Sequence, residues 1–353
     1  MRIVFVCNHF LPSIGGVQLS VHCTAQALSE LGHDVVILTE TPADGWTKPL
    51  PYDIVRFSVP IFRPFTRLLY WGNLWCRRSL FKNADVVHFH DYTPAIHWYL
   101  PLFLFVRSPL YAITFHGFEG YPIKKRHQVL RWLASKLCSV RFGVGEFIRR
   151  WYRHEVDEVF HGAPVHFSEV AQDAADIETV DFLYIGRLEP DTGILECLTA
   201  MDEHGDGEPA RIKVRLIGNG TLRPNIASMQ FTRLDVEFQD STDDVAAYIS
   251  SAKCIIATGY LAVFDALAFG KPVLIPALQQ YKQEYFATPE GLGDHAYIAH
   301  TVSEMRAHIR TIIASEYSIE QLKSERAQFL ARHTWRRIAE MHIDAYQNHE
   351  NAR

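Results

Sequence analysis

Short apolar runs alternate with amphipathic stretches along most of the chain. Residues Arg2 to Cys7 form an apolar run of the kind found in strands buried on both faces of a parallel sheet. A Gly-Gly turn follows, and apolar residues then recur at helical spacing from Gln18 to Leu31, where Gly32 ends the stretch. Further strands of this first series are predicted at 34–38, 54–57, 86–88, 111–114 and 141–144.

A second series of the same kind follows a polar, acidic stretch at residues 168–180, which we interpret as a linker. Its strands are predicted at 182–185, 213–217, 254–257 and 272–275, and its helices at 194–201 and 263–269. Two consecutive β-α-β series predict an α/β protein with two Rossmann-like, doubly wound parallel sheets. The predicted domains span 1–167 and 181–333, and residues 334–353 form a last helix with Thr334 as its N-cap.

Composition narrows the class of protein. The chain has 353 residues, 48% of them hydrophobic, with a formal net charge of −5, which excludes global disorder and allows about two domain cores. The six cysteines are scattered without a C-x-x-C pair, which argues against a disulfide scaffold or a zinc site and favours a reducing compartment. The opening MRIVFVCNHF has the pattern of a strand rather than a signal peptide, and no apolar run is long enough to span a bilayer.

Two glycine-rich loops follow predicted strands, where open α/β sheets bind ligands. Gly15-Gly16 precedes the first long helix, whose free amides and partial positive charge suit a phosphate. Gly218-Asn219-Gly220 follows the strand at 213–217. Taken alone, either loop is better explained as a plain tight turn. Neither forms the G-x-G-x-x-G pattern, which disfavours a nicotinamide-dependent dehydrogenase.

The motifs taken in order resemble glycosyltransferase family 4. In the first half these are GGVQLSVHCTAQALSELGHDVVILT, DVVHFHD at 85–91 and TFHGFE at 114–119. In the second half they are FLYIGRLEPDTGI at 182–194, VRLIGNG at 214–220 and FDALAFGKPVL at 264–274. Their order and spacing match the family over nearly the whole chain.

The resemblance implies the GT-B fold, in which two Rossmann-like domains face each other across a cleft and the C-terminal helix crosses back to the N-terminal domain. It implies a retaining, hexosyltransferase-like enzyme that moves a sugar from a nucleotide-sugar to a hydroxyl of a glycan or lipid-linked acceptor. The nucleotide-sugar is a co-substrate, and no other cofactor and no metal ion are expected. The C-terminal domain would bind the donor, and the basic N-terminal domain the acceptor.

The same resemblance implies roles for particular residues. His116 and Arg187 would be catalytic, with His116 near the donor sugar and Arg187 on the diphosphate. The donor-binding residues would be Gly15, Gly16, Arg187, Thr192, Gly218 and Asp265. The acceptor-binding residues would be His90, Asp91 and Glu119.

Two positions depart from the family pattern. Thr192 stands where the family usually has a lysine, and Ala257 stands where the first carboxylate of a Glu-x7-Glu motif would fall, with Asp265 in place of the second. These departures leave a second hypothesis open, a non-catalytic GT-B subunit that binds a glycan or a partner enzyme. A sugar-nucleotide epimerase on the same fold is a third, weaker alternative.

Several of these residues also have purely structural explanations. Arg187 would pair with Glu189 or Asp191, and Asp265 would favour the dipole at the start of a short helix. His88 and His90 lie on one face of a predicted strand and Asp91 on the other, so a metal cluster is disfavoured.

Charge is distributed unevenly. Residues 1–165 hold 18 Lys/Arg against 12 Asp/Glu, whereas residues 166–353 hold 17 against 28. Segment 61–82 has five cations, no acid and six aromatics, and segment 124–154 has nine cations and Glu146 as its one acid.

The two basic segments with interleaved aromatic residues predict a cytoplasmic protein bound peripherally to the anionic inner face of the cytoplasmic membrane. Such a protein would act in cell-surface polysaccharide or glycolipid synthesis. The alternative is a solvated helix face with its aromatics in the core. Nucleic acid is disfavoured as a partner by the acidic second half and by the transferase motifs.

Overall fold

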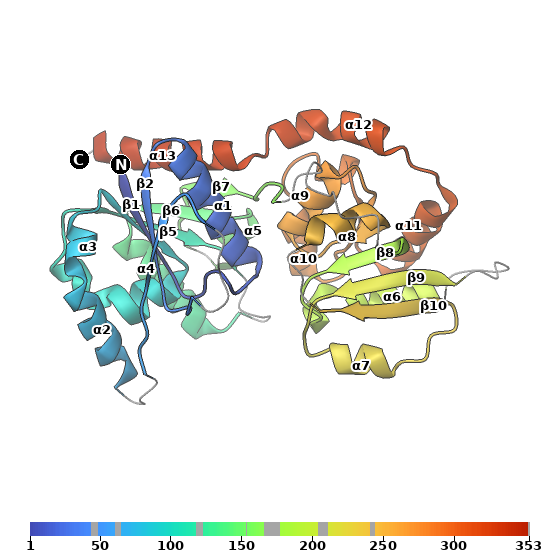
Figure 1. Ribbon diagram of the computed structural model, residues 1–353, viewed down its shortest axis with the longest axis horizontal. Coiled ribbons are helices and arrows are strands. Elements are labelled where there is room, and N and C mark those ends of the chain that lie inside the picture. The colour runs from blue at the N-terminus through green and yellow to red at the C-terminus, as the bar shows by residue number, and fades with distance from the viewer. Residues whose placement is uncertain are drawn as a thin grey trace. The chain divides into compact units, whose positions relative to one another are not determined.

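The computed structural model describes residues 1–43, 49–60, 65–117, 123–152, 154–165, 177–203, 211–240 and 244–351. The chain divides into two compact units (Figure 1). The N-terminal unit comprises Met1–Phe160 and Trp335–Arg353, and the C-terminal unit comprises His161–Thr334. Glu119 and most of the predicted linker, residues 166–176, lie outside the described residues.

The N-terminal unit is built on a seven-stranded parallel sheet in the order β3-β2-β1-β4-β5-β6-β7. Phe5 of β1 lies opposite Ile37 of β2 and His88 of β4, which sets the register of the central strands. β4 is buried along its whole length, as expected for a strand covered on both faces. The strands are β1 (Arg2–Cys7), β2 (Asp34–Thr39), β3 (Asp53–Arg56), β4 (Val86–His90), β5 (Leu110–Phe115), β6 (Val140–Val144) and β7 (Glu158–Phe160).

Helices and short helical turns connect these strands. The helices are α1 (Gly16–Glu30), α2 (Thr66–Cys76), α3 (Arg78–Lys82), α4 (Lys125–Leu137), α5 (Phe147–Tyr152) and the C-terminal α13 (Trp335–Asn351). A π-helical turn, η1 (Pro94–Tyr99), and a 3-10 turn, η2 (Leu100–Leu104), lie between β4 and β5.

The C-terminal unit contains a six-stranded parallel sheet in the order β10-β9-β8-β11-β12-β13. The strands are β8 (Val180–Ile185), β9 (Ile212–Ile217), β10 (Leu234–Gln239), β11 (Ala252–Ile256), β12 (Val273–Pro276) and β13 (Tyr297–Ala299). The helices are α6 (Ile194–Asp202), α7 (Arg223–Ser228), α8 (Val245–Ser251), α9 (Tyr260–Ala268), α10 (Gln280–Phe286), α11 (Val302–Ala314) and α12 (Ile319–Ala331). The predicted fold class, two doubly wound parallel sheets, is confirmed.

The sequence pattern missed β7, β10 and β13, and all three are edge strands. An edge strand has a neighbour on one side alone, so polar residues are tolerated and the apolar run is lost. β10 shows this directly, because Leu234 is its one fully buried residue. The linker prediction also ended one residue too late, since Val180 already belongs to β8.

Helix α13 belongs to the N-terminal unit, where it packs against α1 and contacts β5, β6 and β7 (Figure 1). Tyr346 on α13 shares a hydrogen bond of 2.5 Å with Nδ1 of His88, whose Nε2 lies 2.7 Å from the hydroxyl of Thr114. The His342 ring stacks on Phe142 with centroids 4.1 Å apart. The segment crossing back to the first unit therefore joins a buried cluster of aromatic and imidazole rings.

Burial of this cluster favours neutral imidazoles. It lowers the pKa of His342 to about 4, and it holds the pKa of His88 well below its ordinary value. The unfolded chain has an ordinary histidine pKa and binds protons first as the pH falls. The stability from the neutral rings is thus fully present above pH 6.5 and is lost as the pH falls from there toward 4.

We expect His342→Phe to flatten the acid dependence of folding. Phenylalanine keeps the stacking on Phe142 but cannot bind a proton. In the native protein, His342 alone lowers the free energy of unfolding by about 2 kcal/mol as the pH falls from 7.5 to 5, because the unfolded chain binds the proton more tightly. Denaturant unfolding at several pH values would show this difference in slope. An identical slope in the variant would contradict the assignment.

Candidate functional site

Strand order reverses once in each sheet, and ligands of open α/β sheets bind outside the carboxyl ends of the strands at such points. In the N-terminal unit the reversal lies between β1 and β4, and in the C-terminal unit between β8 and β11. Gly15-Gly16 and His90 follow or end the first pair of strands, and Arg187 and Thr258 follow the second pair. The predicted catalytic and glycine positions thus gather near these two switch points.

The Gly15-Gly16 turn begins α1 directly. Gly15 is the N-cap, with an extended backbone at φ −172° that any residue can adopt. A Cβ on Gly16 would meet no atom within 4 Å, and a Cβ on Gly15 would meet the flexible end of Gln18. Neither backbone conformation nor packing explains the glycine at position 16, which leaves open space above the first free amides of α1.

His116 directly follows β5 and pairs with His90 at the end of β4. Nε2 of His116 lies 2.9 Å from Nδ1 of His90, so one ring donates and the other accepts. Burial lowers the pKa of His116 to about 3, helped by the nearby Arg131 charge, and it also lowers the pKa of His90. Both rings are therefore neutral at neutral pH, so His116 offers hydrogen bonding rather than positive charge.

Asp91 and Arg131 hold the backbone around His116. Asp91 has a left-handed backbone at φ 70°, unusual for a residue other than glycine, and its Oδ1 accepts from the amide of His116 at 3.3 Å. Nη2 of Arg131 donates to this oxygen at 3.2 Å and to the carbonyl of Gly117 at 2.7 Å. Tyr152 donates to the same carbonyl.

Arg131 is fully buried on α4, and its guanidinium lies 4.0 Å from the ring centre of Tyr152. The sequence pattern did not reveal this role, because a lone arginine on a basic helix suggests a surface residue. Burial raises the pKa of Asp91, and Arg131 and the His116 amide oppose that rise. Asp91 and His90 are thus engaged in supporting His116, and their predicted acceptor contacts remain predictions.

The histidines of β4 stack rather than converge on a point. The rings of His88 and His90 are 4.9 Å apart and nearly parallel, and both nitrogens of His88 bond to other side chains. Within the described residues no group of three or more metal-ligating side chains is assembled.

In the C-terminal unit the loop after β8 presents Arg187. Its side chain is 67% exposed and forms an ion pair with Asp191 at 2.9 Å. The Tyr184 hydroxyl donates to the carbonyl of Arg187 and fixes the loop. Thr192 is buried, and its hydroxyl donates to the carbonyl of Glu189 at 2.7 Å, so it supports the loop from within.

Gly218 has a structural requirement of its own. Its φ is +138°, and a Cβ there would overlap the carbonyl oxygen of Gly186. Gly220 is equally confined, against the carbonyl of Leu188. The loops after β8 and β9 therefore pack backbone to backbone at the edge where Arg187 lies.

The expectation that Asp265 lies at the start of a short helix is wrong. It is the sixth of nine residues in α9, because the helix begins at Tyr260, so it does not lie at a helix start. Its buried carboxylate accepts from the amide of Val165 at 2.6 Å. In this structure Asp265 therefore holds the segment that leads into the C-terminal unit, and ribose binding remains a prediction.

Comparisons with known proteins agree with this architecture. The model of Glycosyltransferase Family 4 matches residues 14–160. None of the curated protein sequences matches the chain. Among solved structures, sucrose-phosphate synthase from Thermosynechococcus elongatus has a TM-score of 0.72 at 17% identity, with 100% of each chain covered.

Two further structures are similar at low identity. Anabaena Alr3699/HepE, solved in complex with UDP, has a TM-score of 0.72 at 13% identity and covers 99% of this chain and 100% of its own. WaaG, a glycosyltransferase involved in lipopolysaccharide biosynthesis, has a TM-score of 0.61 at 15% identity, with 99% and 98% covered. The family model confirms the resemblance to glycosyltransferase family 4 over residues 14–160, and the solved structures show that the chain has the GT-B fold.

We expect Arg131→Met to destabilise the protein by about 3 kcal/mol, because it leaves the Asp91 carboxylate without its buried counter-charge. Arg126→Met on the same helix is the matched control, since Arg126 is exposed, and it should change stability by less than about 0.5 kcal/mol. Denaturant unfolding of both variants measures the difference. A loss below about 1 kcal/mol for Arg131→Met would contradict its role as a buried counter-ion.

Proposed function

We propose that the protein transfers a sugar from a nucleotide-sugar to a hydroxyl of a glycan or lipid-linked acceptor, with retention of anomeric configuration. The observation that carries this proposal is the Gly15-Gly16 turn, where neither conformation nor packing requires Gly16. Free amides at the start of a long helix bind phosphate groups, and a side chain at this position would obstruct them. The family 4 match covers this same turn.

The proposed chemistry relies on positioning and charge stabilisation. Arg187 is exposed at the switch point of its sheet, where a guanidinium pairs well with a diphosphate leaving group. His116 is neutral, its ring is held by His90, and its backbone amide donates a hydrogen bond to Asp91, an arrangement that suits a hydrogen bond from the ring to a sugar hydroxyl. The departing phosphate would take the acceptor proton in a front-face displacement, so no metal ion is needed.

A non-catalytic GT-B subunit is the second candidate. It is favoured by the ion pair that already occupies Arg187 and by the buried Ala257, which supplies no carboxylate. Slow donor hydrolysis by the purified protein, tested against a panel of nucleotide-sugars, separates the two. Release of a nucleoside diphosphate supports the transferase, and its absence for every donor supports the subunit.

Gly16→Ala should separate folding from activity. Alanine favours a helix over glycine, so we expect the free energy of unfolding to rise by up to about 1 kcal/mol. We expect donor turnover to fall roughly tenfold or more, because the new methyl lies over the free amides.

Gly293→Ala is the matched control, since a Cβ there also meets no atom within 4 Å and Gly293 precedes β13, at the amino ends of the strands. The control should keep full turnover. Unchanged turnover in Gly16→Ala would refute a ligand above this turn.

We further propose that a surface of the N-terminal unit binds anionic membrane. We call it the α2–η2 patch; its exposed apolar members are Phe65, Leu68, Leu69, Trp75, Leu104 and Phe105. The ring centroids of Trp75 and Phe105 are 5.2 Å apart, and the guanidinium carbon of Arg78 lies 5.3 Å from the ring centroid of Trp75. Helices α2 and α3 lie next to each other in this unit (Figure 1).

Arg77 and Arg78 are cations of the patch, and neither has an acidic partner among the described residues. Arg77 donates to Asn73 and Arg78 to the carbonyl of Trp75, so both charges remain uncompensated. Other members of the predicted segment belong to the core, because Phe81 is buried and Tyr70 stacks on Trp98. No helix in the described part of the chain is long and apolar enough to cross a membrane.

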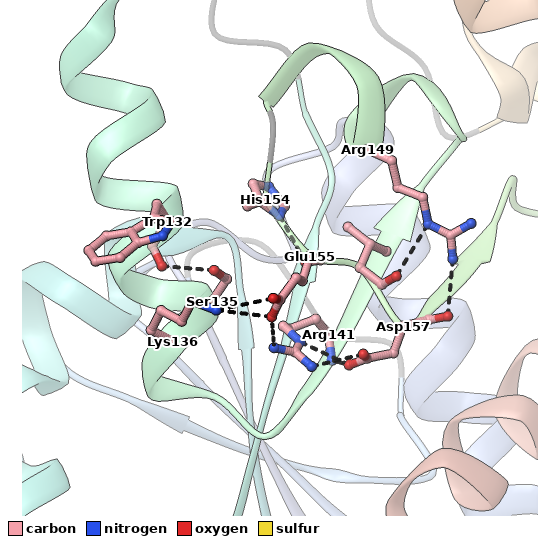
Figure 2. Close-up of polar contacts among 9 residues, drawn as sticks. Trp132, Ser135, Lys136, Arg141, Arg149, His154, Glu155 and Asp157 are labelled. Atoms are coloured by element: carbon pink, nitrogen blue, oxygen red, sulfur yellow. Dashed lines mark hydrogen bonds and ion pairs between the residues drawn. The ribbon is translucent and has the colours of Figure 1, made fainter.

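The second basic segment, 124–154, carries less free charge than its sequence suggests. Figure 2 shows Glu155 contacting both Lys136 and Arg141. The ion-pair distances are 3.1 Å to Lys136 and 2.8 Å to Arg141. Asp157 adds a second carboxylate to Arg141 at 2.8 Å. Both acids lie just beyond the segment, and Arg131 inside it is buried, so the α2–η2 patch is the stronger membrane site.

We expect Arg77→Gln/Arg78→Gln to weaken binding to anionic vesicles about 30-fold, since each cation near the surface contributes about 1 kcal/mol. Lys136→Gln/Arg149→Gln is the control, because both residues are ion-paired and should matter little. Vesicle sedimentation at two salt concentrations measures both. Equal partitioning to neutral and anionic vesicles, or none to either, would leave a soluble acceptor as the better account.

A further inference from the structure

Lys282 is a buried ammonium at the edge of the C-terminal sheet. It lies on α10, after β12, and retains 9% of its exposure. Its Nζ donates to the carbonyl of Thr258 at 2.8 Å. Among the described residues no carboxylate lies within ion-pair distance, and Thr258 supplies the one hydrogen-bond acceptor. Lysine is seldom this buried without a counter-charge, because desolvating the ammonium is costly.

The surroundings of Lys282 connect it to the switch point between β8 and β11. Thr258 lies in the loop after β11, and its hydroxyl is 3.5 Å from that of Tyr184, which fixes the Arg187 loop. Tyr281, beside Lys282 on α10, donates to the carbonyl of Asp191 at 3.1 Å. The ammonium, the Arg187 loop and the start of α9 therefore lie at one edge of the sheet.

Two charged side chains of the Arg187 loop act on Lys282 in opposite directions. Asp191 attracts the ammonium and Arg187 repels it, while Asp191 is itself already paired with Arg187. The aromatic rings of Tyr281 and Tyr285 flank the ammonium, with the Tyr285 centre 5.2 Å away, and both phenols are neutral because burial raises the pKa of each. Burial lowers the pKa of Lys282 to about 8.

We propose that Lys282 binds the diphosphate of the nucleotide-sugar, with Arg187 and the amides at the start of α9 beyond Tyr260 as its partners, since the amide of Tyr260 itself donates to the Tyr285 hydroxyl. This inference rests on the proposed function and adds a binding residue to it. An ammonium has three donors, and the carbonyl of Thr258 uses one. A diphosphate supplies the acceptors and the negative charge that this buried cation lacks.

Calorimetric titration of the intact protein with UDP, GDP and ADP tests the proposal. For whichever of these binds the native protein, we expect Lys282→Met to weaken binding roughly 10- to 100-fold. Binding of the matching nucleoside, which has no phosphate, should be unchanged. Lys253→Met is the matched control, because Lys253 is exposed on β11 and pairs with Asp181, and it should bind like the native protein.

Proton uptake on diphosphate binding is a second measurement, and it is made first on the native protein. Near its pKa of about 8 the amine is only partly protonated, and a bound diphosphate raises that pKa, so binding at a series of pH values around 8 should take up a fraction of a proton. Titrations in buffers of different ionisation enthalpy measure this uptake, which Lys282→Met should abolish. Equal diphosphate affinity in Lys282→Met, or no uptake by the native protein, overturns the role of Lys282. If the native protein binds none of the three diphosphates, the proposed function fails with it.

Discussion

Parallel pairing is the constraint on which the rest of this structure depends. When all strands of a sheet run the same way, every carboxyl end reaches the same edge, and reversal of strand order opens space between two neighbouring loops. Both sheets satisfy this condition. Gly16, His116 and Arg187 lie far apart in the sequence, yet each follows a strand that ends at such an edge. The positions of these residues are therefore a consequence of topology, and their chemistry is a consequence of local burial and charge.

Burial distinguishes the two switch points chemically. In the N-terminal unit it removes charge, because His90 and His116 are held neutral beside the fully buried Arg131. In the C-terminal unit positive charge is retained at the edge, by the exposed Arg187 and by the amine of Lys282. A neutral hydrogen-bonding site suits sugar hydroxyls, and a positive site suits phosphates. This contrast fits the roles proposed for His116 at the sugar and for Arg187 at the diphosphate.

Central strands, and with them the positions of the loops at their carboxyl ends, were predictable from the sequence, because strands buried on both faces leave continuous apolar runs. The edge strands β7, β10 and β13 were not, since a strand with a neighbour on one side alone tolerates polar residues and loses its apolar run. Arg131 and Lys282 were also missed, because nothing in the local sequence shows that a cation will be buried by residues distant along the chain. Thr192 suggested that a cation was absent from the Arg187 loop, whereas the structure has Lys282 on α10 beside that loop. Glu155 and Asp157 form ion pairs with Lys136 and Arg141, and both acids lie just after segment 124–154, so the number of charged residues within that segment overstates its free positive charge.

Hydrogen–deuterium exchange of the intact protein with and without nucleotide-sugars tests the central claim most directly, because it reports where a donor binds without assuming activity. We expect the donor that binds to slow amide exchange in the loops after β8, β9 and β11, around Arg187, Gly218 and Gly259. Peptides at the amino ends of the same strands should exchange unchanged. Protection confined to those amino ends, or no protection by any nucleotide-sugar, would contradict it.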